Sequence, residues 1–243
     1  MRPIVVLPTY NERDNLDDLL RAIRAAHDTI EVLIVDDSSP DGTADLARSL
    51  GDELGGVIVL ERAEKDGLGS AYRAGFSKVL AEGYDVIVSM DGDLSHDPSV
   101  IPVMLERIAG GASVVIGSRY VDGGGTPDWP YRRRFLSKWG NAYTRAVLGL
   151  EPHDCTSGFR AYTAHALAAI EPHNTSAEGY AFLTELVRRL KRHDIVVEET
   201  PIIFRQRVHG KSKMSLRIIV ESMLRVTRWA VEDVLARRSR KAD

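Results

Sequence analysis

Apolar runs alternate with amphipathic segments throughout the first 120 residues of this 243-residue chain. The runs have the length and β-branched content typical of strands, and lie at residues 3–8, 30–37, 56–61, 84–91 and 112–119. The segments between them have the apolar spacing of helices, and lie near residues 13–26, 42–52, 69–82 and 98–109. Such alternation predicts parallel strands joined by right-handed crossovers. The expected fold class is therefore α/β, with a mostly parallel central sheet flanked by helices.

Polar and charged residues follow four of these five runs. Ligands of parallel α/β folds bind beyond the carboxyl ends of the strands, so these positions are expected to face a ligand. They are Pro8-Thr9-Tyr10-Asn11-Glu12, Asp36-Asp37-Ser38-Ser39, Asp91-Gly92-Asp93 and Gly117-Ser118-Arg119-Tyr120. One such end would be an ordinary turn. Four ends, three of them acidic, predict a binding site at this edge of the sheet.

Two carboxylates, Asp91 and Asp93, end the fourth run with only Gly92 between them. One interpretation is a turn, because Asp and Gly are common turn residues. The other is a metal site, because two close carboxylates are stable together when a divalent cation lies between them. With Ser95 or a water molecule as a further ligand, the pair suits Mg²⁺ or Mn²⁺. Asp37, at the neighbouring strand end, would then bind a ribose or a base edge. The polar residues at the other strand ends favour the metal site over a simple turn.

Two common nucleotide-binding motifs are missing. The turn after the first run, residues 8–12, has no glycine that would let a pyrophosphate approach the backbone. Gly67 and Gly69 lack the third glycine of the dinucleotide fingerprint and lie far from the first run. No G-x-x-x-x-G-K-[ST] sequence occurs either. We therefore expect neither a Rossmann dehydrogenase nor a P-loop enzyme.

The net charge of −3 conceals an asymmetry along the chain. Residues 1–100 carry 9 basic and 20 acidic side chains, whereas residues 101–243 carry 23 basic and 15 acidic ones. Two stretches without an acidic residue, 129–150 and 201–220, hold five basic residues each. Such clusters predict an anionic ligand or an anionic surface. Nucleic acid is not expected as a partner, because aromatic residues make up only 7% and no recognition motif accompanies the charge.

The expected compartment is the cytoplasm. The single cysteine, Cys155, excludes an internal disulfide and fits a reducing environment. No apolar stretch is long enough to span a bilayer, and the N-terminal apolar run is too short for a signal peptide.

The regular alternation stops after Tyr120. The expected elements that follow are a Gly/Pro-rich loop (121–130), a basic helix (131–148), a loop (153–162), a helix near 179–192 and a strand near 195–204. A last helical pattern runs from about Ser215 to Ala236. Its charged residues fall within an arc of about 80° at helical spacing. The wide apolar face fits either packing on the core or lying at a membrane interface, and the basic tail 237–241 would favour an anionic leaflet.

Seven motifs in the chain resemble those of the glycosyltransferase family 2 enzymes of GT-A fold, and among them the polyprenol-phosphate (dolichol-phosphate) mannose synthases. They are LPTYNERDNL (7–16), VDDSSPDGT (35–43), GLGSAYRAGF (67–76), MDGDLSHDP (90–98), GSRYVDGG (117–124), DCTSGFRAY (154–162) and FRQRVHGKSK (204–213). Each is weak alone, but together they occur in the family's order over about 210 residues, nearly the whole chain.

The resemblance implies a role for individual residues. Pro8, Tyr10, Glu12, Val35 and Asp37 match positions that hold the nucleotide, and Asp91, Gly92 and Asp93 match the metal and diphosphate motif, with Asp91, Asp93 and Arg119 as catalytic residues. Ser95 stands where some relatives have a metal-binding Gln. Arg119, Arg207 and Lys213 match basic residues near the diphosphate. Arg133 and Ser137 match positions that receive the acceptor phosphate.

The resemblance also implies a GDP-mannose donor, a polyprenyl (dolichyl) phosphate acceptor, a Mg²⁺ or Mn²⁺ cofactor and inversion at the sugar. Residues 1–213 would form the catalytic domain, with a nucleotide-binding half (about 1–120) and an acceptor-binding half (about 121–213). Residues 214–243 would form an amphipathic helix and basic tail. Many relatives add transmembrane helices here, so we expect peripheral attachment to the cytoplasmic membrane face or a membrane-protein partner. The same chemistry with another nucleotide-sugar such as UDP-glucose, and a non-catalytic nucleotide-sugar-binding scaffold, are the alternatives.

Overall fold

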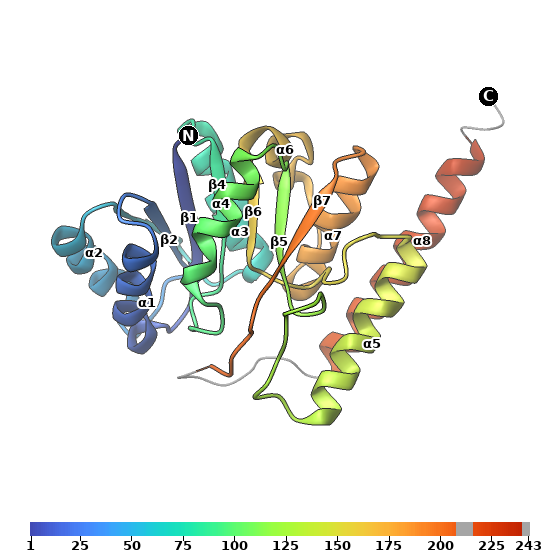
Figure 1. The fold of residues 1–243 in the computed structure, drawn as a ribbon, viewed down its shortest axis with the longest axis horizontal. Coiled ribbons are helices and arrows are strands. Elements are labelled where there is room, and N and C mark those ends of the chain that lie inside the picture. The colour runs from blue at the N-terminus through green and yellow to red at the C-terminus, as the bar shows by residue number, and fades with distance from the viewer. Residues whose placement is uncertain (208–215, 240–243) are drawn as a thin grey trace.

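The computed structural model describes residues 1–207 and 216–239, and its centre is one β-sheet (Figure 1). Seven strands of the described chain form this sheet in the order β3-β2-β1-β4-β6-β5-β7. The strands are β1 (Pro3–Thr9), β2 (Glu31–Asp36), β3 (Val57–Glu61), β4 (Val86–Ser89), β5 (Val114–Ser118), β6 (Arg160–Thr163) and β7 (Val197–Pro201). All strand pairs are parallel except those of β6. The predicted mostly parallel α/β fold is confirmed.

Helices cover both faces of the sheet (Figure 1). They are α1 (Arg13–Ala26), α2 (Thr43–Leu54), α3 (Leu68–Ala81), α4 (Ile101–Ala109), α5 (Tyr131–Leu148), α6 (Ala164–Ala169), α7 (Gly179–Arg192) and α8 (Leu216–Ser239). Two 3₁₀ turns, η1 (Pro98–Val100) and η2 (Pro172–Asn174), lie between them. The helices expected at 13–26, 42–52, 69–82, 98–109, 131–148 and 179–192 are therefore present.

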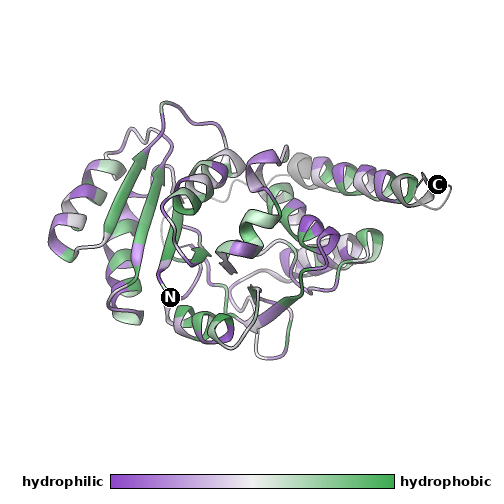
Figure 2. Ribbon diagram, turned by 90° about the horizontal axis from the view of Figure 1, so that it is seen from above, coloured by the Kyte–Doolittle hydropathy of each residue, from purple (hydrophilic) through white to green (hydrophobic). Residues whose placement is uncertain are grey.

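Successive residues of the central strands face two separate cores, because side chains alternate across a strand. Val5 and Leu7 of β1 face the core that includes residues of α1, α2 and α4. Ile4 and Val6 face the core that includes residues of α3, α6, α7 and α8. Figure 2 shows the strands as almost uniformly hydrophobic, while the helices are striped. The strands are buried on both faces, which explains why their sequences lack a polar alternation.

The antiparallel strand β6 was not predicted. It lies between β4 and β5 in the sheet, and it begins inside the segment 153–162 that the sequence predicts as a loop. In the sequence, the charged residue Arg160 argues against a buried strand at this position. In the structure, Arg160 is the first residue of β6 and is fully buried. The structure satisfies this guanidinium with the carbonyl oxygens of Cys155, Ser157 and Leu183 at 2.7–2.9 Å. Burial of a charged group is tolerable when its donors are paired in this way.

Helix α8 packs against α5 and α7 (Figure 1). Val226 and Trp229 enter the core, and Arg188 of α7 pairs with Asp233. The core-packing interpretation of this helix is therefore correct for these positions. Other large apolar side chains of α8 are exposed, namely Val220, Leu224, Val231, Val234 and Leu235. Of the helices within the described residues, none combines the length and the apolar content needed to cross a bilayer.

Candidate active site

The carboxyl ends of β1, β2, β4 and β5 open onto one cavity of about 320 Å³. Most of the residues that the sequence singles out line it, namely Pro8, Tyr10, Glu12, Asp37, Asp91, Gly92, Asp93, Arg119, Arg133 and Arg207. Val35 does not, because its side chain is buried beside Gly75 of α3. Ser95 and Ser137 also lie outside the lining. Lys213 falls outside the described residues, so its predicted role stays a prediction.

The turns that follow β1, β2 and β4 share an unusual backbone conformation. Asn11, Ser38 and Leu94 have φ values of 58°, 55° and 60°. Non-glycine residues adopt this left-handed region at a cost of about 1–3 kcal/mol each, and such residues cluster at functional sites. The conformation turns the chain sharply at each strand end and brings the polar side chains around one cavity.

The β1–β2 end of the cavity combines an aromatic ring with buried charge. The Lys65 ammonium lies 3.5 Å from the centre of the Tyr10 ring. Arg62 donates to Asp37 Oδ1 at 2.5 Å and to the Ser70 hydroxyl at 2.6 Å. Burial raises the pKa of Asp37 and outweighs the opposing effect of Arg62. A ring, a carboxylate and cations at one end suit a nucleoside.

Sequence reasoning missed Arg62 and Lys65. A signal for them exists, because the third apolar run also ends in charged residues. Glu61 ends β3, and Arg62, Glu64, Lys65 and Asp66 follow it directly.

The paired carboxylates lie at the centre of the cavity. Asp93 Oδ1 accepts a hydrogen bond from the Ser95 backbone at 3.0 Å, and Arg207 Nε lies 2.7 Å from its Oδ2. Asp91 Oδ2 lies 3.3 Å from Nε2 of His96. Burial would raise the pKa of Asp91, but His96 and Arg207 hold it below its ordinary value. Asp91 is therefore a carboxylate at neutral pH.

These residues fit a hard divalent cation that shares its coordination with a ligand. A Cβ atom at Gly158 would lie 2.9 Å from Asp91 Oδ1, so only glycine leaves this carboxylate its space. Among the described residues, no three His, Cys, Asp or Glu side chains gather as a complete metal cage. Mg²⁺ is commonly held by one or two carboxylates together with substrate phosphates, which is the donor set available here. The Ser95 hydroxyl is buried without a partner in the described chain, and its predicted contact with a metal stays a prediction.

Arg119 enters the cavity already paired. Its guanidinium donates to both oxygens of Asp154, at 2.6 and 2.7 Å, and to the Thr156 hydroxyl at 2.8 Å. Burial would raise the pKa of Asp154, but Arg119 keeps it below its ordinary value. Asp154 comes from the segment before β6, so this pair fixes that segment against the end of β5. The sequence does not reveal the partner.

An aromatic wall borders the other end of the cavity. The Arg133 guanidinium lies 3.9 Å from the centre of the Trp129 ring, which meets Phe204 edge-on at 5.4 Å. The Tyr120 hydroxyl donates to the Ser137 hydroxyl at 2.6 Å, so Ser137 lies behind this wall. Arg133 and Ser137 both lie on helix α5. Arg133 lines the cavity, whereas Ser137 does not.

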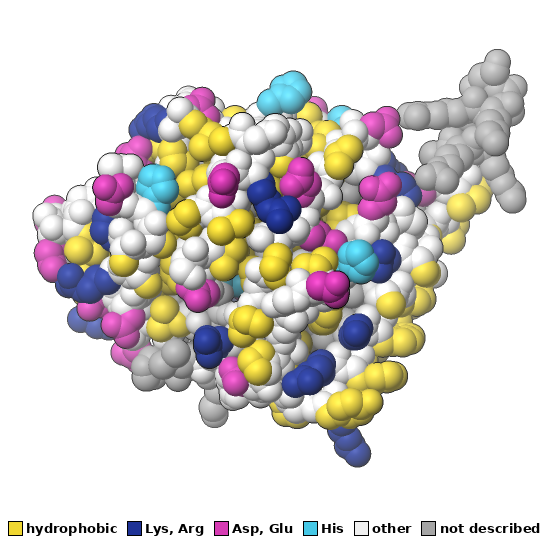
Figure 3. Space-filling model, viewed as in Figure 1, with side chains coloured by type: hydrophobic (Ala, Val, Ile, Leu, Met, Phe, Trp, Pro, Cys, Tyr) yellow, Lys and Arg dark blue, Asp and Glu magenta, His cyan; other side chains and the backbone are white. Residues whose placement is uncertain are grey.

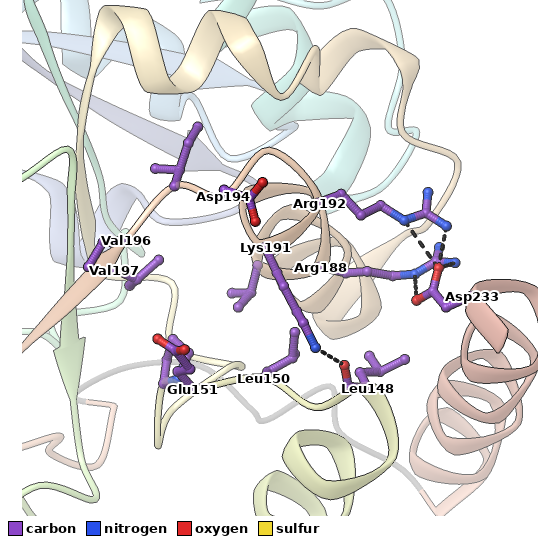
Figure 4. A pocket seen from close by; sticks show the side chains of 13 residues that line it. Leu148, Leu150, Glu151, Arg188, Lys191, Arg192, Asp194, Val196, Val197 and Asp233 are labelled. Carbon is purple, nitrogen blue, oxygen red and sulfur yellow. Dashed lines mark hydrogen bonds and ion pairs between the residues drawn. The ribbon is translucent and has the colours of Figure 1, made fainter. Parts of the chain in front are cut away.

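A second, larger cavity of about 680 Å³ lies between α7, β7 and α8 (Figure 4). Three of its charged groups are paired: Lys191 Nζ donates to the Leu148 carbonyl at 2.8 Å, and Arg188 pairs with Asp233. None of the predicted site residues within the described chain lines it. Its larger size does not make it the candidate active site, because the predicted residues of the described chain gather at the other cavity.

The sheet is mostly parallel, and two carboxylates lie at a strand end with cations beside them. One end of the cavity suits a nucleoside. These features together are typical of nucleotide-sugar transferases with a GT-A fold. Residues 4–170 of the chain match the model of the family described as "Glycosyl transferase family 2". It belongs to this family, and the enzyme class expected from the sequence is confirmed.

Several curated relatives cover almost all of the chain. An undecaprenyl-phosphate mannosyltransferase of Micrococcus luteus is 45% identical over 95% of this chain and 95% of its own. A polyprenol monophosphomannose synthase of Mycolicibacterium smegmatis is 43% identical over 97% of this chain and 89% of its own. A dolichol-phosphate mannosyltransferase of Pyrococcus furiosus is 37% identical over 96% of this chain, which spans 65% of that longer protein.

Solved structures share the fold at low identity. Mannosyl-3-phosphoglycerate synthase from Rubrobacter xylanophilus matches with a TM-score of 0.65 and 20% identity, over 100% of this chain and 75% of its own. A mannosyltransferase from Pyrobaculum calidifontis, in complex with GDP-Man and Mn²⁺, matches with a TM-score of 0.62 and 17% identity, over 92% of this chain and 61% of its own. These likenesses establish the GT-A fold of the chain.

Proposed function

We propose that this enzyme transfers mannose from GDP-mannose to a polyprenyl phosphate, with inversion at the sugar C1, to give polyprenyl phosphate mannose. The observation that carries the proposal is the meeting of Asp91 and Asp93 with Arg207 in one cavity that Arg133 also lines. The three curated relatives, all named for prenol-linked mannose synthesis, supply the sugar and the class of acceptor.

The donor end of the cavity would bind the nucleotide. Pro8, Tyr10, Glu12 and Asp37 are the residues proposed to hold it, and Lys65 extends this set because it lies over the Tyr10 ring. Asp91 and Asp93 would hold Mg²⁺ or Mn²⁺, which when bound neutralises charge on the diphosphate. Residues 1–120 thus form the nucleotide-binding half in this proposal, and residues 121–213 the acceptor-binding half.

The reaction needs little proton transfer. A phosphate monoester is largely ionised at neutral pH, because its second pKa is about 6, so its oxygen attacks C1 without a general base. The bond between C1 and the diphosphate oxygen breaks as the new bond forms on the opposite face. Arg207, Arg119 and Lys213 are proposed to stabilise the leaving diphosphate, although Asp154 offsets part of the charge of Arg119.

The acceptor end would bind the lipid phosphate. Arginine suits this task, because its planar guanidinium binds phosphate oxygens in pairs and keeps its charge. Arg133 presents such a group at the cavity wall, and Ser137 lies one helical turn further along α5. The stacking of Arg133 on Trp129 restricts the guanidinium before the acceptor arrives.

Helices α5 and α8 would carry the enzyme on the cytoplasmic face of a membrane. Figure 3 shows hydrophobic side chains gathered along the edge that these helices form, with Lys and Arg nearby. On α5 they are Tyr131, Phe135, Leu136 and Trp139, and the adjacent Arg132, Arg134 and Lys138 are exposed. Aromatic, aliphatic and basic groups on one face favour an anionic bilayer surface over a purely apolar partner. In this proposal Arg133, which lies on the same helix as this face, would meet the phosphate of a lipid held at the membrane surface.

The decisive experiment measures transfer of radiolabel from GDP-mannose to an organic-extractable product, with polyprenyl phosphate as the acceptor. We expect product with Mg²⁺ or Mn²⁺, none with excess chelator, and recovery when the metal is restored. Asp91→Ala and Asp93→Ala should each abolish the metal-dependent product. Labelled UDP-glucose serves as the competing donor, and a preference for it would overturn the assignment of mannose. Absence of transfer from any nucleotide-sugar would favour a binding scaffold instead.

A further inference from the structure

His96 is buried directly behind the paired carboxylates. Its side chain is 2% exposed, and its ring lies between Phe159, with ring centres 5.2 Å apart, and Phe204, with ring centres 5.0 Å apart. Phe204 in turn packs against Trp129 of the acceptor wall. Packing against these two aromatic rings therefore restricts the orientation of the imidazole.

Neither ring nitrogen of His96 has a hydrogen-bond partner among the described residues. Leaving a buried polar group unpaired costs about 1–3 kcal/mol, so a histidine that served only to fill space would be replaced at a gain by an apolar residue. Oδ2 of Asp91 lies 3.3 Å from Nε2. The imidazole is thus poised next to this carboxylate without being bonded to it.

Asp91 is confined from a second direction. Gly158, beside Phe159, leaves no room for a methyl group next to Oδ1. The carboxylate therefore lies between the Gly158 backbone and the edge of the His96 ring, while Arg207 binds the neighbouring Asp93 rather than Asp91. The edge of the His96 ring is therefore placed to fix the rotation of the Asp91 carboxylate.

We propose that His96 is a positioning residue of the diphosphate site, whose Nε2–H donates to Asp91 Oδ2 once the divalent cation and the nucleoside diphosphate are bound. The role rests on the proposed function, because it presumes that Asp91 is a metal ligand. A neighbour that orients a ligating group generally changes metal affinity by 10–100-fold. His96 acts on the reaction through Asp91 and does not touch the sugar or the acceptor.

The test is the affinity for Mn²⁺ in the presence of GDP, measured from the free Mn²⁺ signal in electron paramagnetic resonance. His96→Phe and His96→Met remove the donor with two different apolar shapes, and His96→Gln keeps an N–H donor. We expect the first two to weaken Mn²⁺ binding 10–100-fold and the third to restore most of it. His27→Phe is the matched control, since His27 also has an unpartnered ring nitrogen but lies at the end of α1.

The outcomes separate the two proposals. If Asp91→Ala loses Mn²⁺ affinity while both apolar variants at His96 bind as the wild type does, the role of His96 is overturned and the metal site stands. If Asp91→Ala keeps wild-type affinity, the metal assignment falls and the role of His96 falls with it. Thermal unfolding of each variant controls for misfolding. Equal losses of Mn²⁺ affinity in the Gln, Phe and Met variants would show that an N–H donor at this position does not restore binding, and would also overturn the proposal.

Discussion

Arg207 and Asp93 form an ion pair, with Nε 2.7 Å from Oδ2, that joins the segment after β7 to the turn after β4. The pair places a guanidinium at the point where the proposed reaction develops negative charge on the leaving diphosphate. It also occupies one oxygen of a proposed metal ligand. We therefore expect Arg207 to contribute to catalysis without contributing to metal binding.

We expect Arg207→Ala to lower kcat for mannosyl transfer by about 10²–10³-fold, the usual effect of removing one donor that stabilises developing charge. The affinity for Mn²⁺ with GDP should stay the same or increase, because Asp93 loses its competing partner. Steady-state transfer and Mn²⁺ titration of the same preparation measure both. Arg107→Ala on α4, far from the cavity lining, is the control. A loss of metal affinity equal to that of Asp93→Ala would contradict this role.

The buried pair of Arg119 and Asp154 predicts a pH-dependent stability. Since the pKa of Asp154 is lowered below 3.8 in the folded state, the pair stabilises the protein fully above about pH 4. The contribution is lost as the pH falls through the lowered value. Asp154→Asn leaves a buried guanidinium without its charge partner, which costs about 3–5 kcal/mol.

Urea unfolding at pH 7 should show this loss, and the difference between wild type and Asp154→Asn should shrink as the pH is lowered below 3.8. Asp233→Asn removes a more exposed carboxylate from Arg188 and Arg192, and should cost less. A constant difference between wild type and Asp154→Asn down to pH 2 would argue against the charge-based explanation.

Gly158 is expected to be intolerant of even one added methyl group. Gly158→Ala forces the Asp91 carboxylate out of its place, because the new Cβ would lie 2.9 Å from Oδ1. We expect transfer activity to fall at least about tenfold, since small displacements of reacting groups have effects of this size or larger. Gly140→Ala on α5 has nothing within 4 Å of the new methyl group and should stabilise its helix slightly. Matching activities for the two variants would show that the position of Asp91 is uncritical.

The predictable parts of the fold are those in which apolar residues recur in the sequence with a strong period. The strands from β1 to β5 and their helices follow from apolar runs, and the acidic strand ends follow from the rule that parallel strands present ligands at one edge. Strand β6 was not predicted because Arg160 breaks its apolar pattern. The carbonyl oxygens that accept hydrogen bonds from Arg160 come from segments far apart in sequence. Pairings such as that of Arg119 with Asp154 likewise depend on tertiary packing, which no local pattern encodes.

The exposed aromatic face of α5 gives the last prediction. Phe135 and Trp139 lie one helical turn apart and are 62% and 45% exposed, so replacing both with Ser should cost little stability. The double variant should bind less to vesicles of anionic phospholipid and transfer less mannose to a long polyprenyl phosphate presented in them. Transfer to a short, water-soluble prenyl phosphate should be unchanged, because the cavity is intact. Val196→Ser, at a 70% exposed apolar position before β7, is the control for surface hydrophobicity. Equal losses with the short and long acceptors would place the defect in the active site and contradict membrane docking through α5.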